Sequence, residues 1–199
     1  MHNKGDSIGI EELLYETDVC RQEGEFDEAI AGYFNILNRI KLDENLYSIH
    51  GSRCLKQLSY CYRKKRDVSN AVLYAKQAVD LAKRINSQDE SQAHRKSLGI
   101  CYMHIGSIYD EIKEYFKAMI YYKKGCECLE KVYGKDTNEY SVLANALISL
   151  GTVYYNLLDF KNAAEIFRRT KEILGDNHSD IRYVYAERYL SEIEHDFDE

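Results

Sequence analysis

The sequence predicts an all-α fold, a right-handed α-solenoid of four helical hairpins followed by a C-terminal capping helix. A short pattern centred on an alanine recurs four times, 42 to 47 residues apart, at Ala29, Ala71, Ala118 and Ala163. The 199 residues include no proline, which is the strongest helix breaker. Repetition at such a period is typical of stacked helical hairpins.

Each alanine belongs to a set of residues at fixed offsets. In the fourth copy Phe160 lies three positions before the alanine, Gly151 twelve before and Leu147 sixteen before. The small residue of each set would let the two helices of a hairpin approach closely. A bulky ring four positions after the alanine, such as Phe167, would fill the space between neighbouring hairpins.

The elements follow from this pattern in chain order. The predicted hairpins pair residues 8–23 with 27–41, 46–64 with 68–85, 90–112 with 115–132, and 137–157 with 160–174. Gly24 suits the left-handed position that ends a helix. A last helix near 179–195 has one apolar stripe opposite a charged face, which fits a cap on the stack. The stripe comprises Ile181, Val184, Tyr185 and Ile193.

The repeat pattern also predicts the domain organisation. A polar lead covers residues 1–9, and the array covers 10–177, with repeats at about 10–43, 52–85, 99–132 and 144–177. The capping helix and an acidic tail occupy 178–199, where residues 187–199 hold six acidic side chains against one arginine. The last five residues either remain in solvent or dock in a basic groove.

The residues of the fourth copy resemble the tetratricopeptide repeat signature. They are Leu147, Leu150, Gly151, Tyr154, Phe160, Ala163 and Phe167. The other three copies match it too, the first one less well at its start. The period exceeds the usual length of about 34 residues, and in this the chain resembles the long-helix subclass of kinesin light chains and Leu-Gly-Asn repeat adaptors. The segment Leu129–Asp136 is similar to the kinesin light chain linker.

The resemblance implies a concave groove that is lined by the first helix of each hairpin and binds a segment of a partner protein. Mapping this face by helical spacing gives the candidate partner-binding residues. They are Arg53, Lys56, Tyr60, Arg63 and Lys64 in the second copy, Ile100 and Met103 in the third, and Asn145, Ile148 and Tyr155 in the fourth. The first copy adds Glu11, Leu14, Asp18 and Arg21.

The cations of the second copy suggest an acidic peptide, because guanidinium groups hold carboxylates in a bidentate manner. The alternative is that these cations complement the dipole at the end of their own helix. Chaperone-binding members of the family resemble one another in a two-carboxylate clamp of lysine, asparagine and arginine. The corresponding positions here are Leu14, Asp18, Gln57, Ile100 and His104, so we expect no binding of chaperone C-terminal tails in that way.

Composition and charge narrow the class of partner. A net charge of −6 argues against a nucleic-acid partner. The sequence lacks a run of about 18 apolar residues, so no membrane insertion is expected. Six cysteines without an apolar secretion signal indicate reduced thiols and a cytoplasmic protein. Cys126 and Cys128 form a single Cys-x-Cys, which lacks the spacing of a zinc site. We therefore expect no metal and no cofactor.

No catalytic motif accompanies the repeats. Gly134-Lys135 is followed by Asp136, so the phosphate-loop pattern is absent, and the six histidines are scattered. The sequence therefore predicts a protein that is not an enzyme but a protein-interaction adaptor or scaffold with a peptide-binding groove. The alternatives are a peptide-sensing regulatory module and a structural assembly subunit.

Overall fold

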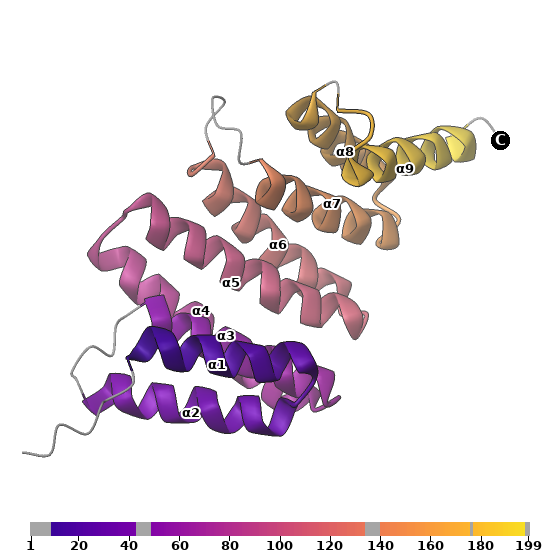
Figure 1. Ribbon diagram of the computed structural model, residues 1–199. Coiled ribbons are helices and arrows are strands. Elements are labelled where there is room, and N and C mark those ends of the chain that lie inside the picture. Colours follow the sequence, from indigo (N-terminus) through magenta and orange to yellow (C-terminus); the bar gives the residue numbers. More distant parts are fainter. Residues whose placement is uncertain (1–8, 43–48, 134–139, 176, 198–199) are drawn as a thin grey trace, which may run out of the picture. The chain divides into compact units, whose positions relative to one another are not determined.

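The computed structural model describes residues 9–42, 49–133, 140–175 and 177–197. Within these ranges the chain forms nine helices and no strand, which confirms the all-α class (Figure 1). The helices are α1 (Ile10–Glu23), α2 (Phe26–Leu42), α3 (Ile49–Lys64), α4 (Val68–Gln88), α5 (Gln92–Glu111), α6 (Tyr115–Glu130), α7 (Ser141–Asn156), α8 (Phe160–Leu174) and α9 (Ile181–Phe197).

The chain divides into two compact units. The N-terminal unit comprises residues 1–89 and contains α1–α4, and the C-terminal unit comprises residues 90–199 and contains α5–α9. Within each unit, consecutive helices pack on one another. The predicted hairpins correspond to α1–α2, α3–α4, α5–α6 and α7–α8. The single array over residues 10–177 stays a prediction.

All four hairpins turn in the same way without proline. One residue per turn has a left-handed backbone, with φ near 60° or above: Gly24, Arg66, Lys113 and Leu158. The amide of the following residue donates to a carbonyl five residues earlier, as Asp159 does to Tyr154 at 2.9 Å. This hydrogen bond satisfies a carbonyl that the end of the helix leaves without a partner. Asp67 and Asp159 then cap α4 and α8 through their side chains.

Small residues bring the two helices of each hairpin together, as the repeat pattern predicts. A Cβ atom on Gly106 would lie 2.6 Å from the Tyr122 ring, and one on Gly151 would lie 2.6 Å from the Phe167 ring. In the second hairpin the Ser59 hydroxyl donates to the Ala71 carbonyl at 2.7 Å. The four alanines of the pattern are fully buried.

One core cluster of the N-terminal unit lies between α1, α2 and α3. It consists of Leu14, Ala29, Tyr33, Ile36, Ile40, Cys54, Leu58 and Cys61. Leu14 was expected on the partner-binding face, and this prediction is wrong because the side chain is buried in the core. Burial also raises the pKa of the thiols of Cys54 to about 12 and of Cys61 to about 11, so both stay protonated and pack as apolar side chains.

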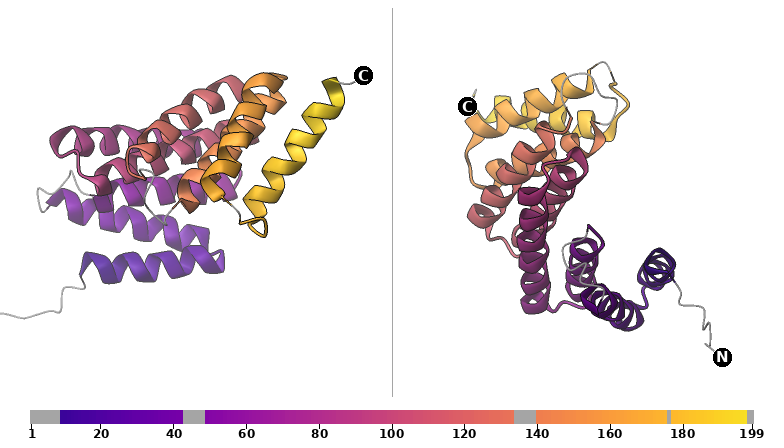
Figure 2. Two further views of the ribbon diagram at one scale, coloured as in Figure 1. Left: turned by 90° about the horizontal axis from the view of Figure 1, so that it is seen from above. Right: turned by 90° about the vertical axis from the view of Figure 1, so that its left-hand side faces the viewer.

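In the C-terminal unit α7 contacts both α5 and α9, and α8 runs beside α9 (Figure 2). The buried side chains of α9 are Tyr183, Ala186, Leu190 and Ile193. Of the predicted stripe only Ile193 is buried, whereas Ile181 is 67% and Tyr185 45% exposed. The prediction that this stripe packs against the repeats was therefore wrong for three of its four residues.

Register explains the true contact face of α9. Its buried residues lie 40 positions after Leu143, Ala146, Leu150 and Val153, which are buried in α7. The α7 residues that face α8 include Gly151, and their equivalents in α9 are exposed: Val184, Glu187, Ser191 and Glu194. Thus α9 packs as the first helix of a further repeat. On the face of α9 that corresponds to the α8-binding face of α7, glutamates are exposed.

Candidate functional site

The structure places the predicted partner-binding residues in two groups, one in each unit. In the N-terminal unit the five α3 residues form a surface that we call the basic face. It consists of Arg53, Lys56, Tyr60, Arg63 and Lys64 of α3, together with Arg21 of α1. In the C-terminal unit, α5 carries Ile100 and Met103, and α7 carries Asn145, Ile148 and Tyr155.

Tyr60 lies at the centre of the basic face. Three cationic groups lie over its ring, at 5.4 Å for Arg21 and 5.5 Å for both Arg63 and Lys64. Cations are attracted to the face of an aromatic ring at such distances. The ring therefore gathers positive charge from two helices at one point of the surface.

A buried carboxylate lies beside this cluster. Asp18 of α1 is only 8% exposed and accepts a hydrogen bond from the Tyr33 hydroxyl of α2. Its other oxygen accepts from Arg53 Nη2 of α3, and Arg21 Nε lies 3.5 Å from the first oxygen. A single side chain thus joins the first three helices.

These contacts fix the protonation state of the group. Burial pushes the pKa of Asp18 upward, but hydrogen bonds from Tyr33 and Arg53 and the charges of both arginines hold it below its usual value. Burial and the neighbouring carboxylate raise the pKa of Tyr33 far above its usual range. At neutral pH Asp18 is therefore ionised, and Tyr33 is a neutral donor.

The two cations of the turn between α3 and α4 have structural roles. Lys65 forms an ion pair with Asp27 of α2, and Arg66 takes the left-handed turn position. For these two residues the structure favours a structural role over contact with a partner.

The predicted residues of the C-terminal unit are mostly half-buried. A Cβ atom on Gly125 of α6 would lie 2.8 Å from Met103 Sδ, so the Met103 side chain packs against α6. The ring of Tyr155 meets Phe160 edge-on at 5.4 Å and Tyr189 of α9 at 5.0 Å. Ile100 and Ile148 are half-buried, and Asn145 is exposed. This surface is apolar, with one amide at its edge.

Sequence reasoning missed residues of α9 that continue this surface. The positions 40 residues after Asn145, Ile148 and Thr152 are Tyr185, Arg188 and Glu192. Arg188 is paired with Glu192 at 2.8 Å, so the charge of this row is balanced. Extending the offset from α7 to the last helix would have revealed them.

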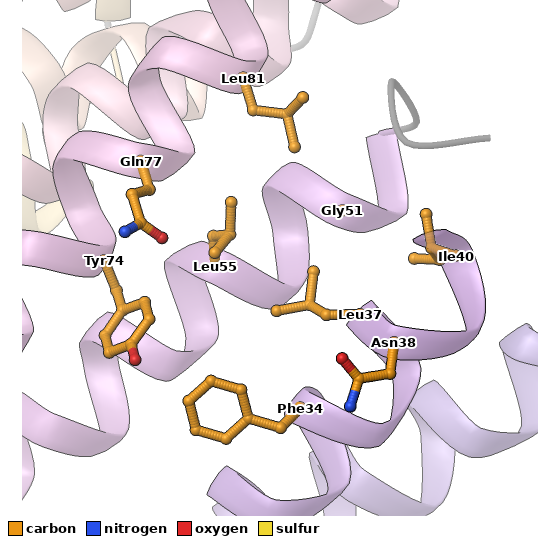
Figure 3. A pocket seen from close by; sticks show the side chains of 9 residues that line it. All are labelled: Phe34, Leu37, Asn38, Ile40, Gly51, Leu55, Tyr74, Gln77 and Leu81. Carbon is orange, nitrogen blue, oxygen red and sulfur yellow. The ribbon is translucent and has the colours of Figure 1, made fainter. Parts of the chain in front are cut away.

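A cavity of about 330 Å³ lies between α2, α3 and α4 (Figure 3). Its lining is Phe34, Leu37, Asn38, Ile40, Gly51, Leu55, Tyr74, Gln77 and Leu81. Phe34 meets Tyr74 edge-on at 5.8 Å, and Tyr62 stacks on Tyr74 at 5.3 Å. The C-terminal unit has a second cavity of about 470 Å³, lined by residues of α6 and α8 and by Tyr133, Tyr140 and Leu143. Neither cavity was predicted from the repeat pattern.

Among the residues that the structure describes, no group of three or more histidine, cysteine or acidic side chains is arranged to hold a metal ion. None of the helices described is long and apolar enough to cross a membrane.

Comparison with known proteins identifies the repeat. A tetratricopeptide repeat model matches residues 101–128, which span the end of α5 and most of α6. Residues 101–128 are thus similar to a tetratricopeptide repeat. No curated protein matches this chain significantly in sequence.

Solved structures share the fold of this chain at low sequence identity. A kinesin light chain-like protein of Podospora anserina with nearly identical repeats has a TM-score of 0.72 at 12% identity, covering 92% of this chain and 84% of that one. BtubC of P. vanneervenii has a TM-score of 0.69 at 17% identity, covering 93% and 75%. The apo form of RapI gives 0.71 at 20% identity, covering 86% of this chain and 58% of RapI. The predicted solenoid class and the resemblance to kinesin light chain repeats are thereby confirmed.

Proposed function

We propose that this protein is a non-catalytic adaptor that binds an acidic segment of a partner protein on the basic face of its N-terminal unit. Its fold neighbours suggest a protein-interaction role, because stacked repeats present extended binding surfaces. The observation that carries the acidic preference is the gathering of Arg21, Arg63 and Lys64 around Tyr60.

Charge complementarity supports an acidic ligand. The basic face holds five cations, and two of them, Arg21 and Arg53, pair with the carboxylate of Asp18. Arginine binds carboxylates through parallel hydrogen bonds, and Tyr60 offers a flat apolar contact beside them. A peptide that carries acidic and apolar side chains matches both properties.

The C-terminal unit would supply a second, apolar contact. Ile100, Ile148 and Tyr155 present partly exposed apolar surface, and Asn145 can hydrogen-bond a peptide backbone. Apolar anchors of this kind dominate the affinity of helical grooves for peptides, whereas charges add selectivity and speed of association. None of the six cysteines forms a disulfide, and each is buried or has a raised thiol pKa, which fits a cytoplasmic location.

Charge reversal of the basic face tests the proposal. The variant Arg53→Glu, Lys56→Glu, Arg63→Glu should weaken binding of a fluorescent peptide rich in aspartate and glutamate by about tenfold or more. Fluorescence anisotropy at several salt concentrations measures this, and a peptide with asparagine and glutamine at the same positions should bind weakly to both proteins.

The matched control places the same charge change on another helix. Lys76→Glu, Lys83→Glu, Arg84→Glu alters exposed cations of α4 and should leave peptide affinity within about twofold, because long-range charge effects are screened by salt. Equal losses in the two triple variants, or none in either, would refute the assignment of the basic face.

One observation favours the assembly-subunit alternative. Ile181, Val184 and Tyr185 leave apolar surface exposed on α9. Sedimentation velocity over a range of concentrations decides: a concentration-dependent shift to larger species supports assembly, and a constant monomer supports the adaptor.

A further inference from the structure

We infer that the exposed side of α9 binds a basic amphipathic helix of a partner protein, in the place where a complete repeat has its second helix. We call this side the open face. It consists of five exposed residues of α9: Ile181, Val184, Glu187, Ser191 and Glu194. The open face belongs to the C-terminal unit, and its role does not depend on the proposed binding of acidic segments by the basic face.

The open face has the register of the surface that receives the second helix in the other hairpins. In the third hairpin the Tyr121 ring of α6 lies 6.3 Å from the Tyr102 ring and 5.6 Å from the Tyr109 ring of α5. A Cβ atom on Gly106, between these two tyrosines, would lie 2.6 Å from the Tyr122 ring. The α9 residues 85 positions after these three α5 residues are Glu187, Ser191 and Glu194.

Contacts on its other side hold α9 in this register. The Tyr189 ring stacks on Phe167 of α8 at 4.9 Å and meets Tyr155 of α7 edge-on at 5.0 Å. Lys171 of α8 pairs with Glu187 at 3.2 Å. The preceding hairpin therefore fixes α9 in place, and the open face remains exposed.

The small residue at the centre of the open face permits close approach of another helix. Ser191 lies 40 positions after Gly151, which admits the Phe167 ring of α8. In the second hairpin a serine has the same position: the Ser59 hydroxyl donates to the Ala71 carbonyl of α4 at 2.7 Å. A serine at this position is thus compatible with a second helix packed directly against it.

Charge decides which kind of helix fits. Glu187 and Glu194 replace the tyrosines of α5, so an apolar helix would bury two carboxylates at high cost, whereas lysine or arginine would pair with them. The Glu187 side chain is still 57% exposed and can accept a second cation beside Lys171. Apolar side chains further along the same helix would cover Ile181 and Val184.

The spacing of the glutamates sets the pattern of the partner helix. Glu187 and Glu194 lie seven residues apart, which is about 10 Å along a helix axis. A partner helix that carries two cations seven residues apart, with a small residue between them on the same side, matches this spacing. We therefore expect lysine, alanine, lysine and leucine at positions i, i+4, i+7 and i+11 of the partner.

A designed helical peptide with this pattern tests the inference. Fluorescence anisotropy at low salt should show saturable binding to the wild type, and the same peptide with glutamate for both lysines should not bind. The variant Glu187→Gln, Glu194→Gln should weaken binding about fivefold or more. The matched control Glu165→Gln, Glu172→Gln removes two exposed glutamates with the same spacing from α8, and affinity should stay within about twofold.

Substitution of Ser191 tests whether a helix packs on the open face. Ser191→Phe should lower the affinity for the peptide about tenfold or more, because a ring at this position holds the two helices apart. Ser191→Ala should stay within about twofold of the wild type. Ser191 is exposed in the free protein, so both variants should fold normally, which circular dichroism checks.

Four outcomes would overturn the inference. Absence of saturable binding to the wild type, or equal losses in the two glutamine variants, would leave α9 as a polar cap only. Unchanged binding by Ser191→Phe would mean attraction between charges without helix packing. Dimerisation of the wild type in sedimentation velocity that Ser191→Phe abolishes would assign the open face to a second copy of the chain.

Discussion

Single side chains set how closely the helices of a hairpin approach. At Gly151 the absence of a Cβ atom admits the Phe167 ring, and at Gly106 it admits Tyr122. The fixed offsets of the repeat predicted these small residues and their rings from sequence, because such contacts lie within one hairpin and recur in each copy. The offsets were less informative for Leu14, since helical spacing defines a face but not which neighbour covers it.

Substitution at Gly151 makes this dependence measurable. We expect Gly151→Val to destabilise the protein by about 2 to 3 kcal/mol, because its Cβ would lie 2.6 Å from the Phe167 ring, which is fully buried and has no room to move. Thermal and urea unfolding measure the loss. Gly9→Val is the control, because a Cβ there meets nothing within 4 Å and the change should be small. Equal stability of the two variants would contradict the close packing at Gly151.

Whole helices are positioned by a few polar contacts at their ends. Asp180 precedes α9, and its carboxylate accepts from the Arg182 backbone amide at 2.9 Å and from Arg182 Nε at 2.7 Å. Arg182 Nη1 also donates to the Ser141 carbonyl at the start of α7, at 2.7 Å. Sequence predicted α9 and its approximate bounds, but not the side that packs, because its apolar residues define two competing stripes.

The ion pair between Asp180 and Arg182 makes the docking of α9 dependent on pH. The side chain of Arg182 lowers the pKa of Asp180 from 3.8 to about 2. Because the pKa is lower in the folded state, the ionised carboxylate stabilises the fold above the usual pKa, and this contribution is lost as the pH falls toward about 2. Carboxyl NMR titration should show this low pKa, and Arg182→Gln should return it toward 3.8. Arg188→Gln, which affects another ion pair of α9, should leave it unchanged. A normal pKa of Asp180 in the wild type would exclude the contact in solution.

At the scale of the whole molecule, the chain is a set of repeats gathered into two compact units. The repeat pattern predicted the number and order of the hairpins correctly. It contained no signal for the division at residues 89 and 90, because it treats every copy alike. The basic face was found from its cations, but its internal carboxylate was not recognised as a partner of Arg53, since the two residues lie 35 positions apart and no local spacing joins them.

The division into two units predicts that a destabilising substitution in one unit mainly lowers the stability of that unit. Leu58→Ala, in the core of the N-terminal unit, should lower local stability by about 2 to 5 kcal/mol. Hydrogen exchange should then accelerate mainly in α1–α4 and much less in α5–α9, because stability in repeat proteins is largely a sum of neighbouring contacts. Leu147→Ala should give the mirror result. Uniform acceleration along the chain in both variants would show that the two units unfold as one.

The buried cysteines of each unit can report how fast that unit opens locally. Cys54 and Cys61 lie in one unit and Cys101 and Cys126 in the other, all shielded from water. Burial raises the pKa of Cys126 to about 12, as it does for the first pair, so a thiol-modifying reagent finds almost no thiolate in the native protein. Alkylation of a buried thiol therefore requires the helices that cover it to separate transiently. The alkylation rate of each cysteine, measured by mass spectrometry, therefore reports the rate of local opening in its unit.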